Sequence, residues 1–416
     1  MGTAVDFLLV GGGLASATAL ETLLQADMGG SRIALVAAEQ ELPYHRPPLS
    51  KGYLLGKRNR DSVFVKPRDF YERAGVILRL GTKVTTVQPE AHTVTTDQSE
   101  TVQYGKLLLA TGCAVRKLTV PGGDLPRVFM LRTLADSDAL RATQEHAKSV
   151  LIVGGSFIGM ELASAFAQKG LRTTLLHRGK EVFDKLGSPE ASAFFARYYA
   201  ERGVTIRTED EATAVERRPG TDGPLAVTTK RGDTLTVDFV AVGVGVVPDI
   251  KYLETSGIKL DNGVVVNEYL EASVPNVYAA GDVANFFDPL YQRQRRIEHW
   301  DTAIQHGKVA GANMAETDPA RRVPYAAVSY FFSDVFDVSF EYFGDATGTD
   351  RTITRGSFDD RAVTLFYVEN ATVRAAFIMG RPWERKALIE LLRTQQPVQN
   401  PDELANPEVP LPQPSA

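Results

Sequence analysis

The stretch DFLLVGGGLASATAL, residues 6–20, decides the fold. Its apolar run at residues 7–10 is typical of a buried parallel strand, three glycines follow at once, and an amphipathic pattern then predicts a helix. A strand, a glycine turn and a helix N-terminus form a phosphate cradle, because the helix offers free N–H groups and the positive end of its dipole. Gly11 permits the tight turn, and Gly13 lets a pyrophosphate approach the backbone. The stretch predicts a nucleotide-binding unit, with an ordinary glycine-rich turn as the alternative.

The residues that follow the cradle support a dinucleotide site. Ser16 stands at the third glycine position of the GxGxxG pattern, and its small side chain still permits close packing of helix on strand. A second strand is predicted at residues 33–36, and Glu39 lies just past its end, where an acid accepts hydrogen bonds from a ribose diol. Taken alone, Glu39 is also explained as a solvated surface carboxylate.

A second cradle is predicted later in the chain. Residues 150–153 form another apolar run, which GGSFIG at residues 154–159 and a helix pattern follow, and two such cradles suggest two bound nucleotides. Ser156 replaces the middle glycine and fits less easily against a pyrophosphate. The matching second strand ends at His177 and Arg178, a basic pair that suits a 2′-phosphate, so NADPH is favoured over NADH. The alternative is that both are exposed loop residues and that both cofactors are used.

The composition limits the classes of protein to which the chain can belong. With 416 residues it is too long for one core and predicts two or three domains. A hydrophobic fraction of 44% is typical of a globular protein, and the net charge of −5 argues against nucleic acid as the main partner. The one cysteine, Cys113, excludes a disulfide within this chain. Because we find neither an apolar stretch of about 18 residues nor a basic and apolar leader, we expect a cytoplasmic protein that does not bind membranes.

The order of the segments predicts an α/β fold with three domains. A Rossmann-like nucleotide-binding domain is expected over residues 1–114 and 246–320, and a second one over residues 115–245. The aromatic-rich residues 321–416 predict a C-terminal α+β interface domain, with a flexible tail from about residue 396.

Two further segments carry groups that a cofactor in the first cradle could use. The proline-rich loop of residues 41–56 holds Arg46 and Lys51, which are otherwise explained as solvated basic residues. A strand predicted near residue 276 ends in Gly281 and Asp282, and this carboxylate can bind a polyhydroxyl chain or sit at a helix N-terminus.

Five motifs together match one superfamily. They are GGGLAS at residues 11–16, PYHRPPLSKGYL at 43–54, ATG at 110–112, GGSFIGMELA at 154–163 and AAGDVA at 279–284. Apart from its tail, the chain resembles FAD-dependent NAD(P)H reductases with a glutathione-reductase-like fold. Within them it resembles the oxygenase-coupled ferredoxin reductases, the monodehydroascorbate reductases and apoptosis-inducing factor. The EHW sequence at residues 298–300 is similar to the ferredoxin reductases, whereas residues 331–345 are more similar to the monodehydroascorbate reductases.

The resemblance implies FAD in the first cradle, NAD(P)H in the second, and no metal site. It implies that Glu39 binds the adenosine ribose, that Arg46 and Lys51 lie along the flavin, and that Asp282 lies at the ribityl-phosphate region. Ser156, His177 and Arg178 depart from the family pattern. The expected cofactor-binding residues are Gly11, Gly13, Leu14, Ala15, Glu39, Arg46, Lys51, Thr111, Gly112, Gly154, Gly155, Ser156, Phe157, Ile158, Gly159, Glu161, His177, Arg178, Gly243, Gly281, Asp282, Glu298, His299 and Trp300.

The resemblance also implies hydride transfer from NAD(P)H to the flavin, followed by release of single electrons. Lys51 and Glu161 are the expected catalytic residues. Lys51 beside the flavin N5 stabilises the charge of the reduced cofactor, and Glu161 holds the ammonium group in place. Two unrelated surface charges are the alternative. Trp300 is expected at the opposite face of the isoalloxazine, on the side of the acceptor.

The sequence leaves the electron acceptor open among three classes. We rank first a ferredoxin-type iron–sulfur protein that docks over Trp300. Arg293, Arg295 and Arg296 then form a basic landing patch, and the alternative for them is a solvated basic loop. The second class is a small organic radical or quinone. The third is a redox switch similar to apoptosis-inducing factor, for which turnover is not the purpose. Formation of a homodimer is also left open.

Overall fold

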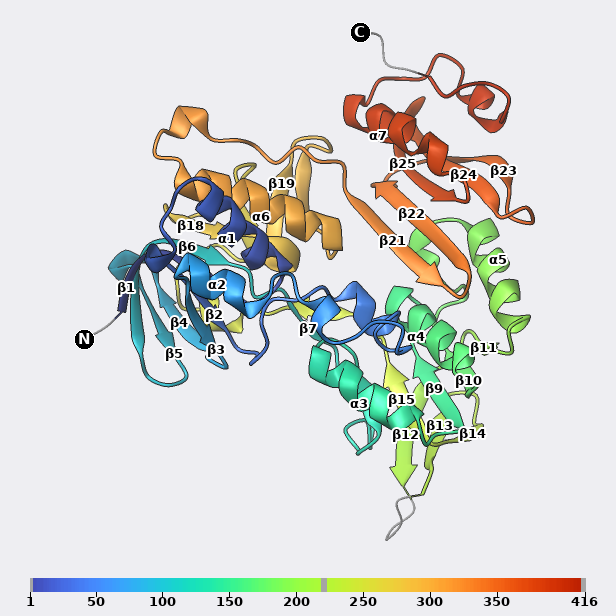
Figure 1. Ribbon diagram of the computed structural model, residues 1–416. Helices are drawn as coiled ribbons and strands as arrows, with labels where there is room; N and C mark the ends of the chain where they lie inside the picture. Colours follow the sequence, from blue (N-terminus) through green and yellow to red (C-terminus); the bar gives the residue numbers. More distant parts are fainter. Residues whose placement is uncertain (1–2, 218–222, 413–416) are drawn as a thin grey trace. The chain divides into compact units, whose positions relative to one another are not determined.

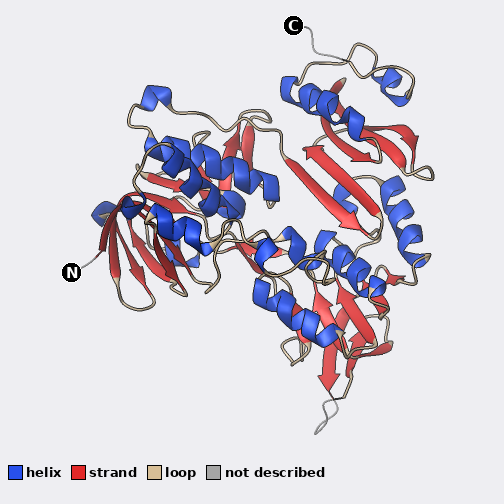
Figure 2. Ribbon diagram, in the orientation of Figure 1, coloured by secondary structure: helices blue, strands red, loops and turns tan. Residues whose placement is uncertain are grey.

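The computed structural model describes residues 3–217 and 223–412, and the chain divides into two compact units (Figure 1). The first unit holds Met1–His45, Arg60–Ala114 and Val247–Ser329. The second holds Arg46–Asn59, Val115–Val246 and Tyr330–Ala416. Both units combine helices with sheets (Figure 2). Each unit is therefore assembled from segments that are separated in the sequence.

The first unit is built on a seven-stranded sheet with the order β3-β2-β1-β6-β5-β4, in which β18 also pairs with β6. The strands are β1 (Thr3–Val10), β2 (Ile33–Ala37), β3 (Ile77–Leu80), β4 (Val84–Gln88), β5 (Thr93–Thr96), β6 (Thr101–Leu109) and β18 (Val277–Ala279). The pairs that join β1, β2, β3, β6 and β18 are parallel, whereas β4, β5 and β6 pair antiparallel. Val10 lies opposite Val36 and Leu109, so the turns after β1, β2 and β6 leave the sheet at one edge.

Small residues let two helices of the first unit pack closely. The helices of this unit are α1 (Leu14–Gln25), α2 (Arg68–Ala74) and α6 (Trp300–Ala315), and α1 lies beside α6 (Figure 1). A Cβ atom on Gly307 would stand 2.5 Å from the carbonyl oxygen of Ala15, and one on Gly311 would stand 2.8 Å from that of Ala19. Glycine is therefore required where the two backbones approach. A second sheet of this unit contains β17 (Val264–Val266), β19 (Ala284–Asp288) and β20 (Arg293–Arg296).

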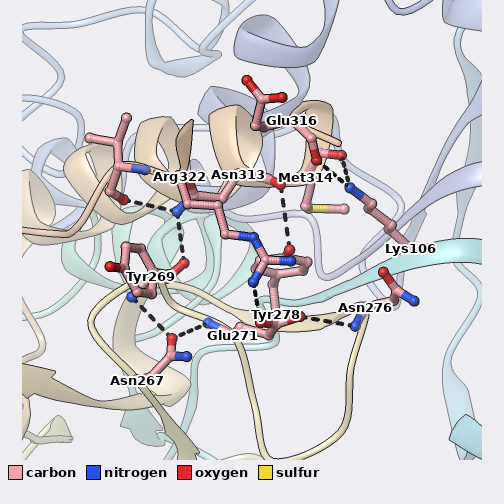
Figure 3. A network of polar contacts seen from close by, with 11 residues as sticks. Lys106, Asn267, Tyr269, Glu271, Asn276, Tyr278, Asn313, Met314, Glu316 and Arg322 are labelled. Carbon is pink, nitrogen blue, oxygen red and sulfur yellow. Dashed lines mark hydrogen bonds and ion pairs between the residues drawn. The ribbon is translucent and has the colours of Figure 1, made fainter. Parts of the chain in front are cut away.

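A polar network fixes the C-terminal end of α6 (Figure 3). Lys106 donates from Nζ to the carbonyl oxygens of Met314 and Glu316 at 2.7 and 2.9 Å, at a helix end where carbonyls lack intrahelical partners. Asn313 donates from Nδ2 to the carbonyl oxygen of Tyr269 at 3.0 Å. The network therefore ties α6 both to β6 and to the segment that follows β17.

The second unit begins with a five-stranded parallel sheet in the order β11-β10-β9-β15-β8. Its strands are β8 (Val128–Met130), β9 (Ser149–Val153), β10 (Arg172–Leu176), β11 (Thr205–Arg207) and β15 (Phe239–Val242). The helices are α3 (Leu134–Gln144), α4 (Phe157–Gln168) and α5 (Pro189–Ala200), and an antiparallel sheet is formed by β12 (Ala212–Arg217), β13 (Leu225–Thr229) and β14 (Thr234–Val237). This part has the Rossmann-like character that the second cradle predicts.

The C-terminal part of the second unit is an antiparallel sheet with the order β21-β22-β25-β24-β23, together with one α-helix, as an α+β region requires. The elements are β21 (Tyr330–Val335), β22 (Val338–Gly344), β23 (Arg351–Ser357), β24 (Ala362–Glu369), β25 (Thr372–Met379) and α7 (Arg385–Thr394). The ring of Phe340 lies 5.1 Å from that of Phe195 and 5.6 Å from that of Phe183, and Phe331 lies 4.6 Å from Phe157. The Rossmann-like part and the C-terminal sheet thus share an aromatic cluster, and the division into three domains stays a prediction.

Short elements complete the chain. The strands β7 (Cys113–Val115) and β16 (Val246–Pro248) pair with each other where the chain passes from one unit to the other. The 3₁₀ turns are Gly30–Arg32, Pro47–Ser50, Asp61–Val63, Pro89–Ala91, Asp184–Leu186, Lys251–Leu253, Gly281–Val283, Pro319–Arg321, Pro382–Glu384 and Pro401–Ala405. Over residues 3–217 and 223–412, no helix has the length and apolar character that crossing a membrane would need.

The residues from 396 to 412, predicted as a flexible tail, make defined contacts with the C-terminal sheet, and their flexibility stays a prediction. Arg355, on β23, is only 3% exposed and points its guanidinium at this segment. It donates to the carbonyl oxygens of Leu404, Pro407 and Val409 at 3.3, 3.2 and 2.8 Å, and also to that of Asn406. One buried side chain therefore satisfies several main-chain acceptors of a segment whose composition suggests no structure.

Candidate functional site

The first cradle has the backbone that a pyrophosphate needs. Gly11 has a φ of +118°, and a Cβ atom there would stand 2.2 Å from the carbonyl oxygen of Ala110, so only glycine fits this turn. Among the described residues, no atom lies within 4 Å of where a Cβ on Gly13 would stand, and Gly13 is the N-cap of α1. The N–H groups of Leu14 and Ala15 open the helix at this point. The site therefore fits a dinucleotide phosphate.

The groups expected around this cradle follow neighbouring strands. Glu39 lies after β2, and its carboxylate accepts a hydrogen bond from the Tyr44 hydroxyl at 2.6 Å. Thr111 and Gly112 lie after β6, and the Thr111 hydroxyl donates to the carbonyl oxygen of Asp249 at 2.9 Å. Because the carboxyl ends of β1, β2 and β6 share one edge, these residues gather at the cradle, as in other sheets of this kind.

The turn at Gly281 and Asp282 lies against the same cradle. It follows β18, which pairs with β6, and a Cβ on Gly281 would stand 3.2 Å from Cβ of Ala15 in the first turn of α1. The Gly281 N–H donates to Nδ1 of His306 at 3.3 Å, and this histidine is fully buried. Burial lowers the pKa of His306 to about 3, so the ring is neutral and can accept the bond. Sequence reasoning did not identify His306.

Two of the three arginines predicted to form a landing patch are already paired. Arg295 lies 2.7 Å from Asp288, and Arg296 lies 2.7 Å from Glu298, with each arginine side chain only 11% exposed. Arg296 also donates to the carbonyl oxygen of Asp282 at 3.1 Å. The predicted basic patch is therefore wrong for Arg295 and Arg296, because the sequence shows their charges but not their carboxylate partners.

Two predicted aromatic site residues, His299 and Trp300, lie at the start of α6. His299 caps the helix, and Trp300 donates from its indole nitrogen to Nδ1 of His45 at 3.1 Å. This bond fixes the orientation of the indole ring. In all, the first unit holds the predicted site residues Gly11, Gly13, Leu14, Ala15, Glu39, Thr111, Gly112, Gly281, Asp282, Glu298, His299 and Trp300.

The second cradle repeats the backbone of the first. Gly154 also has a φ of +118°, and a Cβ atom there would stand 2.3 Å from the carbonyl oxygen of Gly243, which follows β15. A Cβ on Gly159 would stand 1.8 Å from the carbonyl oxygen of Gly154, so the third glycine permits the close helix–strand packing of this motif. Ser156 caps α4 without a side-chain hydrogen bond among the described residues. The site fits a second nucleotide phosphate.

His177 and Arg178 do not act as the predicted basic pair. His177 is 8% exposed, and its Nδ1 accepts a hydrogen bond from the Gly155 N–H at 3.1 Å. Burial lowers the pKa of His177, so the ring is neutral and supplies no charge for a phosphate. Arg178 is exposed and keeps the charge that the prediction requires. The basic character expected from two residues therefore rests on Arg178 alone.

Lys51 and Glu161 form the ion pair that the resemblance implies. The Lys51 ammonium lies 2.6 Å from Oε1 of Glu161, and the two side chains are 14% and 5% exposed. The hydroxyls of Ser50 and Ser333 donate to Glu161 at 2.5 and 2.6 Å, and the Lys51 ammonium lies 5.3 Å from the centre of the Phe332 ring. Ser50 lies in the motif at residues 43–54, and Phe332 and Ser333 lie in the stretch of residues 331–345, but neither pattern shows that these residues contact Lys51 or Glu161. This pair with its two serines is called the Lys51–Glu161 network below.

The second unit holds the other predicted site residues. They are Arg46, Lys51, Gly154, Gly155, Ser156, Phe157, Ile158, Gly159, Glu161, His177, Arg178 and Gly243. Arg46, expected along the flavin, donates to the carbonyl oxygen of Arg132. Ile158 is 41% exposed in the first turn of α4, where a ligand on the cradle would meet it.

The sequence matches two family models that together span most of the chain. The model described as pyridine nucleotide-disulphide oxidoreductase matches residues 5–307, and the model described as reductase C-terminal matches residues 330–414. The chain belongs to the pyridine nucleotide-disulphide oxidoreductase family, and it is an NAD(P)H-dependent flavoprotein oxidoreductase. The predicted fold class is confirmed.

Named relatives confirm the resemblance to both kinds of reductase. The ferredoxin reductase subunit of 5,5′-dehydrodivanillate O-demethylase from Sphingobium is 36% identical over 90% of both proteins. Putidaredoxin reductase from Pseudomonas putida is 31% identical over 98% of this chain and 96% of its own length. A monodehydroascorbate reductase from Arabidopsis thaliana is 31% identical over 94% of this chain and 82% of its own length.

A solved structure has the same fold over almost the whole length. The crystal structure of a covalent putidaredoxin reductase–putidaredoxin complex matches with a TM-score of 0.92 and 30% identity. The match covers 98% of this chain and 97% of that chain.

Proposed function

We propose that this protein is a reductase that takes hydride from NADPH onto FAD and passes single electrons to a ferredoxin-type iron–sulfur protein. The observation that carries the proposal is the combination of two complete phosphate cradles with the buried Lys51–Glu161 network. When bound, the flavin accepts a hydride and releases its electrons one at a time. The relatives named as ferredoxin reductases, and the complex with putidaredoxin, support the class of acceptor.

The residues of the chain have distinct roles in this proposal. The glycine turns and the N-termini of α1 and α4 bind phosphates, while Glu39 and Asp282 orient polyhydroxyl groups. Lys51 supplies a positive charge in a site with little water, where a charge stabilises developing negative charge more than it does in solution. Glu161 holds that charge in place. No proton acceptor is required for hydride transfer.

The proposal includes direct transfer of electrons, without a redox-active disulfide. The chain contains one cysteine, Cys113, which is buried and accepts a hydrogen bond from Arg296 at 3.2 Å. A disulfide relay would need a second thiol. A cytoplasmic location also stays part of this proposal.

The preference for NADPH rests on Arg178. Neither of the two residues that follow β10, His177 and Arg178, is a carboxylate. The exposed guanidinium of Arg178 suits a 2′-phosphate. His177 is neutral and adds no charge to the site, and a neutral imidazole is compatible with a phosphate nearby.

The acceptor is tested by following cytochrome c reduction with NADPH, with and without an added [2Fe–2S] ferredoxin, at low and high salt. We expect a large gain that depends on ferredoxin, and its loss as salt rises would identify electrostatic docking. A fast rate that is indifferent to ferredoxin would instead support a small organic radical or quinone as acceptor, which the monodehydroascorbate reductase relative favours. Negligible turnover with a flavin that NADPH reduces would favour the redox switch.

A further inference from the structure

The Glu161 carboxylate is the meeting point of three separate segments of the second unit. It lies on α4 and is 4% exposed. Lys51 and Ser50 reach it from residues 46–59, and Ser333 reaches it from β21 in the C-terminal sheet. The Ser333 hydroxyl shares Oε1 with the Lys51 ammonium, and each lies 2.6 Å from that oxygen.

Burial and a neighbouring hydrogen bond hold Ser333 in its position beside Glu161. Its side chain is fully buried, so water has no access to replace its hydroxyl. Three residues further along the same hairpin, the N–H of Phe336 donates to the hydroxyl of Ser164 at 2.7 Å. Ser164 lies about one turn after Glu161 on α4, so two hydrogen bonds hold the hairpin in register on this helix.

A buried carboxylate needs more than one partner to stay in a single orientation. Its lone pairs must be satisfied by hydrogen bonds as well as by the opposite charge, or the burial is costly. Without Ser333, Oε1 would keep only the long and flexible Lys51 side chain. Oε2 would keep the Ser50 hydroxyl, so the carboxylate would turn about that one remaining hydrogen bond and the ammonium would move with Oε1.

We propose that Ser333 is a positioning residue for the redox site, which fixes Glu161 and through it the Lys51 ammonium. This gives the C-terminal sheet a direct part in cofactor reduction, beyond any part in docking or dimerisation. The inference rests on the proposed function, because it assumes that Lys51 serves the bound flavin.

The test compares the holoenzyme variants S333A, K51A and the double variant S333A/K51A. Stopped-flow reduction of the bound flavin by saturating NADPH is measured together with the flavin midpoint potential. We expect S333A to slow reduction about tenfold, with less than about a twofold change in the Kd for NADPH, and to shift the midpoint potential to a lower value. In the K51A background, S333A should have no further effect, because the serine acts through the lysine.

The controls separate the two hypotheses. Ser339, on the next strand, donates to Asp334 on the exposed surface, so S339A should match the parent enzyme in every measurement. If K51A leaves reduction unchanged, the proposed role of the pair is wrong. If K51A slows reduction but S333A behaves as S339A does, only the inference about Ser333 is wrong.

A structural role for Ser333 gives a different result. An equal loss from S333A in both backgrounds, or a loss that leaves the midpoint potential unchanged, would overturn the inference. Should S333A fail to fold, S333C keeps the shape of the side chain with a larger atom in place of oxygen and offers only a weak donor, so the same comparison is made with it.

Discussion

Two buried histidines each accept a hydrogen bond from a glycine N–H in a cofactor turn. His177 accepts from Gly155 in the second cradle, and His306 accepts from Gly281 beside the first. Burial lowers the pKa of both rings, so both are neutral. Protonation would remove the acceptor nitrogen and place a charge among apolar neighbours. For His306 these neighbours are the rings of Phe286 and Tyr325, at 4.6 and 4.5 Å.

The state of His306 predicts how stability depends on pH. The folded pKa is about 3, against 6.5 for an exposed histidine, so between these values the unfolded chain binds a proton that the folded chain does not. The free energy of unfolding should therefore fall as the pH drops from 6.5, by up to about 1.4 kcal/mol per pH unit from this residue. Urea unfolding at pH 7.5, 6 and 5 measures the slope. The H306Q variant keeps an acceptor for the Gly281 N–H but does not titrate, so the free energy of unfolding should depend less steeply on pH. An unchanged slope in H306Q would show that His306 does not cause the pH dependence.

Arg178 determines the choice of pyridine nucleotide in our proposal. R178A should lower kcat/KM for NADPH about tenfold, because an ionic hydrogen bond to the 2′-phosphate is lost. The value for NADH should change less than about twofold. The exposed neighbour Lys180 provides a matched variant, and K180A should leave the ratio of the two values unchanged. Equal losses with both nucleotides in R178A would show that this residue does not recognise the phosphate.

At the scale of elements, local patterns were predicted well and distant partners were not. Both cradles were found because strand, glycine turn and helix are adjacent in the sequence. The pairing of Lys51 with Glu161 came from the resemblance, since no spacing rule joins a loop to a helix so far along the chain. The contact of Ser333 with Glu161 could not be predicted for the same reason. The sequence shows the positive charges of Arg295 and Arg296. It does not show that Asp288 and Glu298 pair with them in place of an exposed basic patch.

The C-terminal segment shows how one distant residue can order an element. Besides its main-chain contacts, Arg355 forms a buried ion pair with Glu384 at 2.7 Å. R355M should lower the free energy of unfolding by about 3 kcal/mol and release the segment of residues 396–412, because four main-chain acceptors lose their donor and Glu384 loses one of its two arginine partners. Hydrogen exchange of that segment measures the release. Arg351 lies on the same strand and pairs with Asp402 on the exposed surface, so R351M should cost less than about 1 kcal/mol. Equal effects of the two substitutions would refute the buried clamp.

At the scale of the whole molecule, the C-terminal sheet is a structural part of the second unit. Phe340 of β22 is 1% exposed and contacts rings from the Rossmann-like part of the same unit. The change in composition at residue 321 predicts a separate domain, and it carries no information about an aromatic cluster that the two regions share.

Truncation tests this shared cluster. A chain that ends at Ser329 should lose the cover of Phe157, Phe183 and Phe195, expose a large apolar surface and aggregate. Soluble yield and binding of a hydrophobic dye measure the result. A chain that ends at Gln395 keeps β21 to α7 and should stay soluble. A truncated chain ending at Ser329 that is monomeric and unfolds cooperatively would refute the shared core.

Residues 46–59 belong to the second unit, although the segments on both sides of them belong to the first. This interruption matters for recombination between related genes. A crossover that exchanges only the stretch encoding residues 115–246 would bring Glu161 from one parent while Ser50 and Lys51 remain those of the other, and Ser333 would also remain. The network would then be inherited in pieces, so functional chimeras should be restricted to parents that agree at all four positions.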